Sequence, residues 1–127
     1  ILFKHGPSMN MLDATDSTIN TVFNYDCLWG IRDLEWSPDG NTIAVMESLV
    51  QGAHEVKFIN PDGSNHHLLI SLRAEDLCQV IYDLAWSPDG SMIAVTGGNG
   101  IYVIRTNGSV VTKLYAASDT PMYIDWF

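Results

Sequence analysis

An eight-residue motif occurs twice in the sequence and sets the organisation of the whole chain. Residues 33–40 read Asp-Leu-Glu-Trp-Ser-Pro-Asp-Gly, and residues 83–90 read Asp-Leu-Ala-Trp-Ser-Pro-Asp-Gly. Each copy is followed by an Ile-Ala-Val triplet. A third, shortened copy, Tyr-Ile-Asp-Trp-Phe, occupies 123–127, so that successive tryptophans of the motif are 50 and 40 residues apart. A period of this length is typical of propeller blades and of long helical repeats.

The local chemistry favours strands over helices. In Ser-Pro-Asp-Gly, proline presets φ for a turn and glycine adopts the positive φ that closes a hairpin. Leu84 and Trp86 alternate with Asp83, Ala85 and Ser87, which is the period of two expected of a strand. Further Asn-Gly turn signals separate the short apolar runs that follow. Four short strands joined by turns make one blade, and we find no helical periodicity.

The predicted fold class is therefore all-β, a β-propeller of four-stranded blades with three blades per chain. We treat 1–127 as a single module. The last three strands of a first blade are placed at about 1–25, a second blade at about 31–72 and a third at about 80–115. The first strand of a closing blade is placed at about 121–127.

An open array of three blades poses a physical problem, because propellers use about four to eight blades packed face to face around an axis. Open ends expose apolar sheet faces and unpaired strand edges, and both promote association. The closing strand, with Tyr123, Ile124 and Trp126, complements the first blade, which lacks its first strand. We therefore expect a two-fold homodimer that exchanges these strands and completes six blades. The alternatives are a fragment of a longer propeller and a stand-alone three-bladed structure.

The motif Trp-Ser-Pro-Asp-Gly, followed by Ile-Ala-Val, resembles the repeat of the TolB-type, or WD40-like, β-propellers. The resemblance covers two blades fully and a third in part. The Trp-Asp dipeptide that closes WD40 repeats is absent, since the third strands end in Ile59-Asn60 and Ile104-Arg105, and this favours the TolB-like branch. The resemblance implies a bacterial, extracytoplasmic scaffold. TolB-like propellers also occur beside hydrolase domains in relatives of prolyl oligopeptidase.

The two faces of such a propeller carry different loops. The turns within hairpins on one face are short and stereotyped, whereas the opposite face carries the longer, variable segments. Binding residues concentrate on irregular loops held by a rigid scaffold, and large aromatics are preferred anchors. The partner-binding candidates on that face are two aromatic and five acidic residues: Tyr25, Trp29, Asp26, Asp33, Asp76, Asp83 and Asp119.

Each candidate also has a purely structural interpretation. Trp29 has no aromatic counterpart in the next blade, so it either anchors a partner or packs under its own loop. Asp33 and Asp83 repeat at the start of the first strand, near the axis. With Asp26, Asp76 and Asp119 they either form a negative funnel for a cationic segment, a metal ion or a small ligand, or they bind nearby backbone N–H groups.

Composition and missing motifs exclude several functions. The net charge of -9 repels a phosphate backbone, so we expect no nucleic-acid partner. No apolar run approaches the roughly 20 residues of a membrane-spanning helix. Neither a nucleophile elbow nor a phosphate-binding glycine loop occurs. Adjacent His66 and His67 point to opposite faces of a strand and cannot share an ion. A disulfide between Cys27 and Cys78 would need their Cα atoms within about 7 Å, which loops of neighbouring blades do not guarantee. We therefore expect two reduced thiols.

The function predicted from the sequence is that of a non-catalytic scaffold without metal or cofactor, which presents its loop face to a protein or peptide. One alternative is a small-ligand or carbohydrate site in the acidic funnel. The other is a fragment of a larger propeller-containing protein, such as a hydrolase of the prolyl-oligopeptidase type.

Overall fold

The computed structural model describes residues 1–6, 8–24, 30–49, 52–72, 81–98, 100–109, 111–116 and 123–127. Within these ranges it contains three antiparallel sheets. The first sheet holds β1 (Leu2–His5), β2 (Ser8–Leu12) and β3 (Ile19–Asn24). The second holds β4 (Ile31–Trp36), β5 (Ile43–Ser48), β6 (His54–Ile59) and β7 (His67–Leu72). The third holds β8 (Ile81–Trp86), β9 (Met92–Gly97), β10 (Gly100–Arg105) and β11 (Val111–Ala116).

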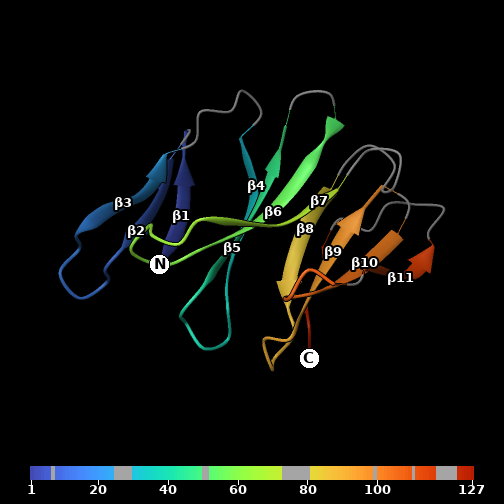
Figure 1. Cartoon of the computed structure of the whole chain (residues 1–127). Helices are drawn as coiled ribbons and strands as arrows, with labels where there is room; N and C mark the ends of the chain where they lie inside the picture. The colour runs from blue at the N-terminus through green and yellow to red at the C-terminus, as the bar shows by residue number, and fades with distance from the viewer. Residues whose placement is uncertain are drawn as a thin grey trace.

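The predicted fold class is confirmed, because the described chain is all-β and its sheets have three or four antiparallel strands. Strands that follow each other in the sequence are neighbours in each sheet. The sheets lie side by side in chain order, from β1–β3 on the left to β8–β11 on the right, like the blades of a partial propeller (Figure 1). No helix long and apolar enough to cross a bilayer occurs in the part of the chain that the structure describes.

The repeated Ser-Pro-Asp-Gly turn is built in the same way in the second and third sheets. The Ser37 hydroxyl donates to Asp39 Oδ1 at 2.6 Å, and the Ser87 hydroxyl donates to Asp89 Oδ1 at 2.6 Å. Gly40 closes the first turn with a φ of 71°, a left-handed conformation that glycine adopts without strain. These turns join the first and second strands of each sheet, and the side of the molecule that holds them is called the turn face below.

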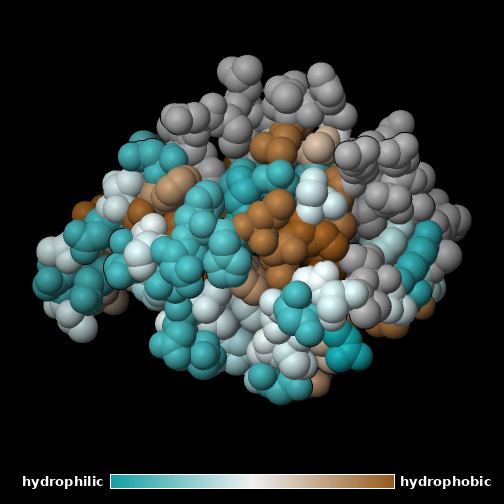
Figure 2. Space-filling model, in the orientation of Figure 1, coloured by the Kyte–Doolittle hydropathy of each residue, from teal (hydrophilic) through white to brown (hydrophobic). Residues whose placement is uncertain are grey.

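Two apolar layers between the sheets form the core. Between the first and second sheets, Met9 packs with Ile31, Ile43, Val45 and Ile59. The layer between the second and third sheets is larger: it contains Ala44, Met46, Val56, Phe58 and Leu72 on one side and Ile81, Leu84, Trp86, Ile93, Val95, Tyr102 and Ile104 on the other. Apolar side chains also gather over the middle of the visible surface, where β6 to β8 lie (Figure 2). Stability therefore depends on contact between blades.

Two glycines bring each blade close to the outer strand of the blade before it. Gly63, in the turn before β7, has a φ of 83°, and a Cβ built on it would lie 2.3 Å from the carbonyl oxygen of Val22 in β3. Gly108, in the turn before β11, has a φ of 73°, and its Cβ would lie 3.1 Å from the carbonyl oxygen of Leu69 in β7. The same approach therefore occurs at both junctions between blades.

We predict that Gly63→Ala lowers the free energy of unfolding by at least about 2 kcal/mol, because backbone strain and a backbone clash act together. Gly40→Ala is the matched control: its φ is 71° and its Cβ meets nothing within 4 Å, so strain alone costs about 1 kcal/mol. Urea denaturation followed by tryptophan fluorescence measures both. Equal losses in the two variants would contradict the close approach of the blades.

Candidate functional site

The first strands of the second and third sheets, β4 and β8, lie against each other and are joined by two hydrogen bonds. The Leu84 N–H donates to Asp33 Oδ2 at 2.9 Å. The indole N–H of Trp86 donates to the carbonyl oxygen of Glu35 at 3.3 Å. At the junction between blades, the Asp of the repeated motif thus accepts a hydrogen bond and the Trp of the motif donates one.

The same pair of bonds recurs one repeat further on. The Ile124 N–H donates to Asp83 Oδ2 at 2.8 Å, and the Trp126 indole donates to the carbonyl oxygen of Ala85 at 3.1 Å. Residues 123–127 therefore have the same relation to β8 that β8 has to β4. They belong to no sheet in the described structure, because a ladder needs a neighbouring strand, and no described strand lies where β5 lies beside β4.

The oxygens of Asp33 bind backbone, which is the structural interpretation that the sequence offered for this residue. Its Oδ1 accepts the N–H of Leu34 at 2.9 Å and its Oδ2 accepts the N–H of the neighbouring blade. The remaining loop-face candidates, and both cysteines, lie outside the described residues: Tyr25, Asp26, Trp29, Asp76, Asp119, Cys27 and Cys78. The acidic funnel as a whole stays a prediction.

The structure adds two carboxylates that the sequence analysis missed. Glu35 and Asp125 occupy the same position of the repeated motif, two residues after the Asp33 position, and this shared position was the available signal. Burial raises the pKa of Glu35, and the charges of Asp33, Asp83 and Asp125 raise it further. The inner strands therefore carry a cluster of four carboxylates that repel one another.

The pKa of Asp83 is raised to about 6. Burial is the main cause, and a hydrogen bond with Asp33 and its negative charge add to the rise. The N–H groups of Ile124 and Leu84 act in the opposite direction, because they stabilise the carboxylate. The folded protein therefore holds a proton on this group at a pH at which the unfolded chain, with an ordinary pKa of about 3.9, has lost it.

We predict that the free energy of unfolding of the wild type, relative to that of Asp83→Asn, falls as the pH rises from about 4 to about 6.5, because folding takes up a proton on Asp83 and this uptake becomes less favourable as protons become scarcer. Asparagine keeps an oxygen for the Ile124 N–H. Urea titrations at several pH values measure the difference. Asp89→Asn is the control: hydrogen bonds from Ser87 and Ser91 lower the pKa of Asp89 to about 2, so its difference rises slightly up to about pH 5 and is flat above that, and it does not fall. A flat difference for Asp83→Asn would contradict the raised pKa.

The ends of the strands opposite the turn face differ from blade to blade, and this side is called the loop face below. In the second sheet, the Arg32 guanidinium donates to Ser48 Oγ at 2.9 Å, and Ser48 Oγ shares a hydrogen bond of 3.0 Å with His54 Nδ1. Ser48 and His54 are buried. The third sheet has Tyr82 and Gly98 where the second has Arg32 and Ser48. This network therefore belongs to one blade and not to the repeat.

A second polar cluster lies at the same end of the second sheet. Glu47 and Glu55 are directly opposite in the pairing of β5 with β6, so their like charges repel. Lys57 Nζ lies 2.9 Å from Glu47 and 3.0 Å from Glu55 and compensates both. Burial lowers the pKa of Lys57, but hydrogen bonds and charges of the two carboxylates outweigh burial and raise it. Glu47 is 2% exposed, so the ion pair with Lys57 offsets part of the cost of burying its carboxylate.

We predict that Lys57→Met destabilises the fold by about 2–3 kcal/mol at neutral pH, because two carboxylates, one fully buried, lose their only counter-charge among the described residues. Lys113→Met is the matched control. That lysine is exposed and lies over the Tyr102 ring, 5.5 Å from its centroid, so its loss costs less than about 1 kcal/mol. Thermal and urea unfolding compare the two. A loss at Lys57 no larger than that at Lys113 would refute the compensation.

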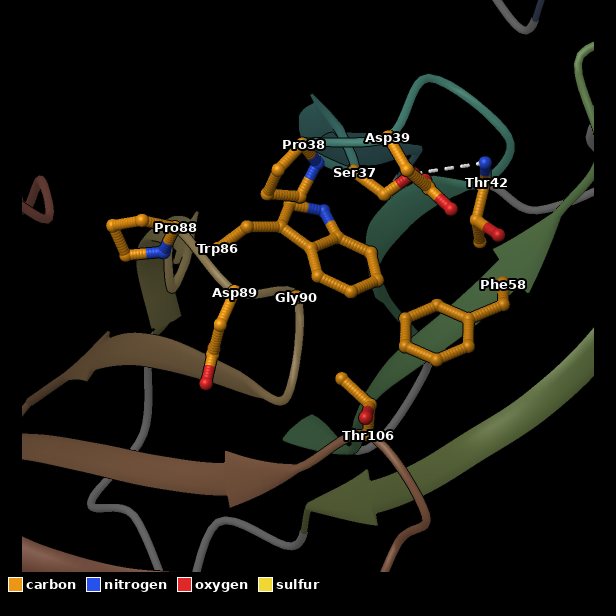
Figure 3. A pocket seen from close by; sticks show the side chains of 10 residues that line it. All are labelled: Ser37, Pro38, Asp39, Thr42, Phe58, Trp86, Pro88, Asp89, Gly90 and Thr106. Atoms are coloured by element: carbon orange, nitrogen blue, oxygen red, sulfur yellow. Dashed lines mark hydrogen bonds between the residues drawn. The ribbon is translucent and has the colours of Figure 1, made fainter.

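A groove of about 480 Å³ separates the two Ser-Pro-Asp-Gly turns on the turn face (Figure 3). Trp86 stacks on Phe58 within it, with ring centroids 5.1 Å apart and planes at 18°. Asp39 and Asp89 at its rim are occupied by hydrogen bonds within their own turns. A smaller groove of about 320 Å³ lies beside Trp126, the repeat equivalent of Trp86. Such grooves arise from the junction between blades.

The described ranges contain no group of three or more His, Cys, Asp or Glu side chains placed to hold a metal ion.

The sheets and the junctions between them define a protein of the β-propeller class. Comparisons with known proteins identify proteins of similar fold. A family model described as "WD domain, G-beta repeat" matches residues 67–104, from β7 to β10. TolB from Acinetobacter baumannii has a TM-score of 0.68 at 19% identity, over 88% of this chain and 28% of that chain. An oligogalacturonate lyase in complex with manganese has a TM-score of 0.69 at 16% identity, over 87% and 29%. A chain of a nidogen/laminin complex has a TM-score of 0.70 at 16% identity, over 90% and 42%.

The chain has a β-propeller fold similar to that of TolB, and residues 67–104 match the model of a WD40 repeat, so the prediction from the repeated motif is confirmed at the level of fold. At these identities the likeness concerns fold alone. The chain spans between 28% and 42% of the length of the three solved structures, so it corresponds to part of a propeller. No curated protein matches the sequence.

Proposed function

We propose that this chain is a non-catalytic propeller scaffold that presents its loop face to a protein or peptide, and that its open ends are completed by strand exchange between chains. The TolB-type fold supports a scaffold role, and we extend it, on the resemblance, to a site of action outside the cytoplasm.

The observation that carries the proposal is the difference between the two faces. On the turn face, the second and third sheets have the same Ser-Pro-Asp-Gly turn with the same internal hydrogen bonds. At the loop face, the second sheet holds the Arg32–Ser48–His54 network and the Lys57 cluster, and the third sheet holds neither. A face that varies between copies of a repeat offers distinct chemistry at each blade, which a specific partner requires.

Charge indicates the kind of partner. The chain has a net charge of -9, and Asp33 and Asp83 stand near the loop-face ends of the inner strands. Tyr82, next to Asp83, is 39% exposed and adds an aromatic surface at the same end. An acidic surface with an exposed aromatic side chain suits a basic peptide segment. The Asp33 oxygens already bind backbone N–H groups, so Asp33 would attract such a segment through its charge and not through a direct hydrogen bond; a small-ligand site that needs free carboxylate oxygens is less well supported.

One observation favours a second candidate function. The chain covers less than half of each of the three solved structures described above, which supports a segment of a larger propeller-containing protein. In that case the loop face would contribute to a site built with further blades.

The proposal is tested by selecting peptides from a random phage-displayed library on the full chain and measuring their affinity by fluorescence anisotropy. We expect basic peptides whose affinity falls at least tenfold for Tyr82→Ala and for the double variant Asp33→Asn with Asp83→Asn. The turn-face control, Asp39→Asn with Asp89→Asn, should stay within twofold. Melting temperatures are measured in parallel, since a large drop for the Asp33 and Asp83 variant indicates backbone binding as its main role. Peptides that bind all variants equally would overturn the loop-face assignment.

A further inference from the structure

The two ends of the described array complement each other. In the second and third sheets, the strands β5 and β9 are each paired with an inner strand, β4 and β8. In the first sheet, β1 holds the corresponding place and is an edge strand, because that sheet has only three strands. Residues 123–127 in turn lie in the inner-strand position against β8 and belong to no sheet. Among the described residues, the chain thus holds a segment in an inner-strand position without a sheet, and a sheet without an inner strand.

A register shift shared by all three sheets identifies which of their residues are equivalent. The pairing of the two outer strands shifts between Met9 and Asn10 in the first sheet, between Val56 and Lys57 in the second, and between Ile101 and Tyr102 in the third. Met9, Val56 and Ile101 are therefore equivalent.

Strand pairing extends this equivalence to the neighbouring strands β1, β5 and β9. The residues paired with Met9, Val56 and Ile101 are Lys4, Met46 and Thr96. Since Met46 pairs with Asp33 and Thr96 with Asp83, a strand added to β1 in the same register places Tyr123 opposite Lys4. By the same steps Asp125 lies opposite Leu2, as Glu35 lies opposite Ala44.

The apolar surfaces of the two ends also match. Beside Trp126, the open side of the third sheet has a groove of about 320 Å³ lined by Met92, Val103 and Leu114. Leu114 is 64% exposed, whereas its equivalent Leu69 packs against the core under the next blade. On the first sheet, Ile1 is 69% exposed, whereas its equivalent Ile43 is fully buried. Each end therefore exposes side chains that are covered at the internal junctions.

Charge favours a copy of this chain as the occupant. At the internal junction, Thr106 in the turn before β11 lines the groove with Phe58 and Trp86. The equivalent turn of the first sheet, at 13–18, carries exposed Asp13 and Asp16. The open groove is lined by Arg105, which is exposed. Opposite charges thus meet when the first sheet of one copy covers the third sheet of another.

We propose that a second copy of this chain fills both open ends. Residues 123–127 of each copy pair with β1 of the other, and the two-fold arrangement closes six blades without leaving an edge. This inference rests on the proposed function, because ring closure fixes the rigid support of the loop face.

The test uses the full chain with Cys27→Ser and Cys78→Ser. Light scattering should give twice the chain mass of 14.1 kDa. Leu2→Cys combined with Asp125→Cys should form a disulfide-linked dimer on mild oxidation, because directly opposite residues of antiparallel strands lie within disulfide reach. The matched control combines Leu2→Cys with Tyr123→Cys, two residues out of register, and should not cross-link. Trp126→Ala in the wild-type background should weaken dimerisation at least tenfold.

A monomer by light scattering, an open-ended polymer, a disulfide within one chain, or equal cross-linking in and out of register would each overturn the proposal. A monomer would assign the open ends to blades of a longer polypeptide. Measuring the selected peptides on the same samples separates the two proposals. If a monomer binds the peptides, the scaffold function is supported and the dimer is contradicted. If a cross-linked dimer binds no peptide, the dimer is supported and the scaffold function is contradicted.

Discussion

The hydrogen bonds between successive inner strands are the interaction on which the rest of the structure depends. One blade supplies the Asp33 carboxylate and the Glu35 carbonyl oxygen, and the next supplies the Leu84 N–H and the Trp86 indole. These bonds fix the height of each blade relative to its neighbour, so the apolar faces meet in register and Trp86 stacks on Phe58. A sheet of four strands has too little core to be stable alone, so its stability resides in such junctions.

This dependence explains why the turn face is uniform and the loop face is not. Trp86 and the turn that follows it must fit against the previous blade, which constrains the Ser-Pro-Asp-Gly sequence in each repeat. Away from the inner strands, at the loop-face end of β5 and β6, the second sheet accommodates a buried glutamate compensated by Lys57. Four carboxylates lie on the inner strands near the same contacts, and burial, with the hydrogen bond and charge of Asp33 added to it, raises the pKa of Asp83 there.

The motif predicted the all-β propeller because turn chemistry and strand alternation act locally and repeat. It also predicted an inner strand at 123–127 from Trp126; these residues are bonded to β8 but belong to no sheet, so the strand stays a prediction. What it missed depends on strand pairing. Glu47 lies opposite Glu55 only in the observed register, so the role of Lys57 was not visible in the sequence. For Asp33 the sequence offered two interpretations, an acidic funnel and backbone binding. The choice between them required the structure, in which the Leu84 N–H lies beside the carboxylate and favours backbone binding.

The repeated junction also bears on how such an array is completed. An open row of blades has one junction fewer than it has blades, while a closed ring has as many junctions as blades. Closing two rows on each other adds two junctions at once and orders no new sheet, since β1–β3 and residues 123–127 are already placed. The apolar area of Leu114 and Ile1 would then be buried, against the costs of association entropy, side-chain ordering and the repulsion between two chains of charge -9. Whatever chain supplies the missing neighbours, these ends favour a partner shaped like the blades already present.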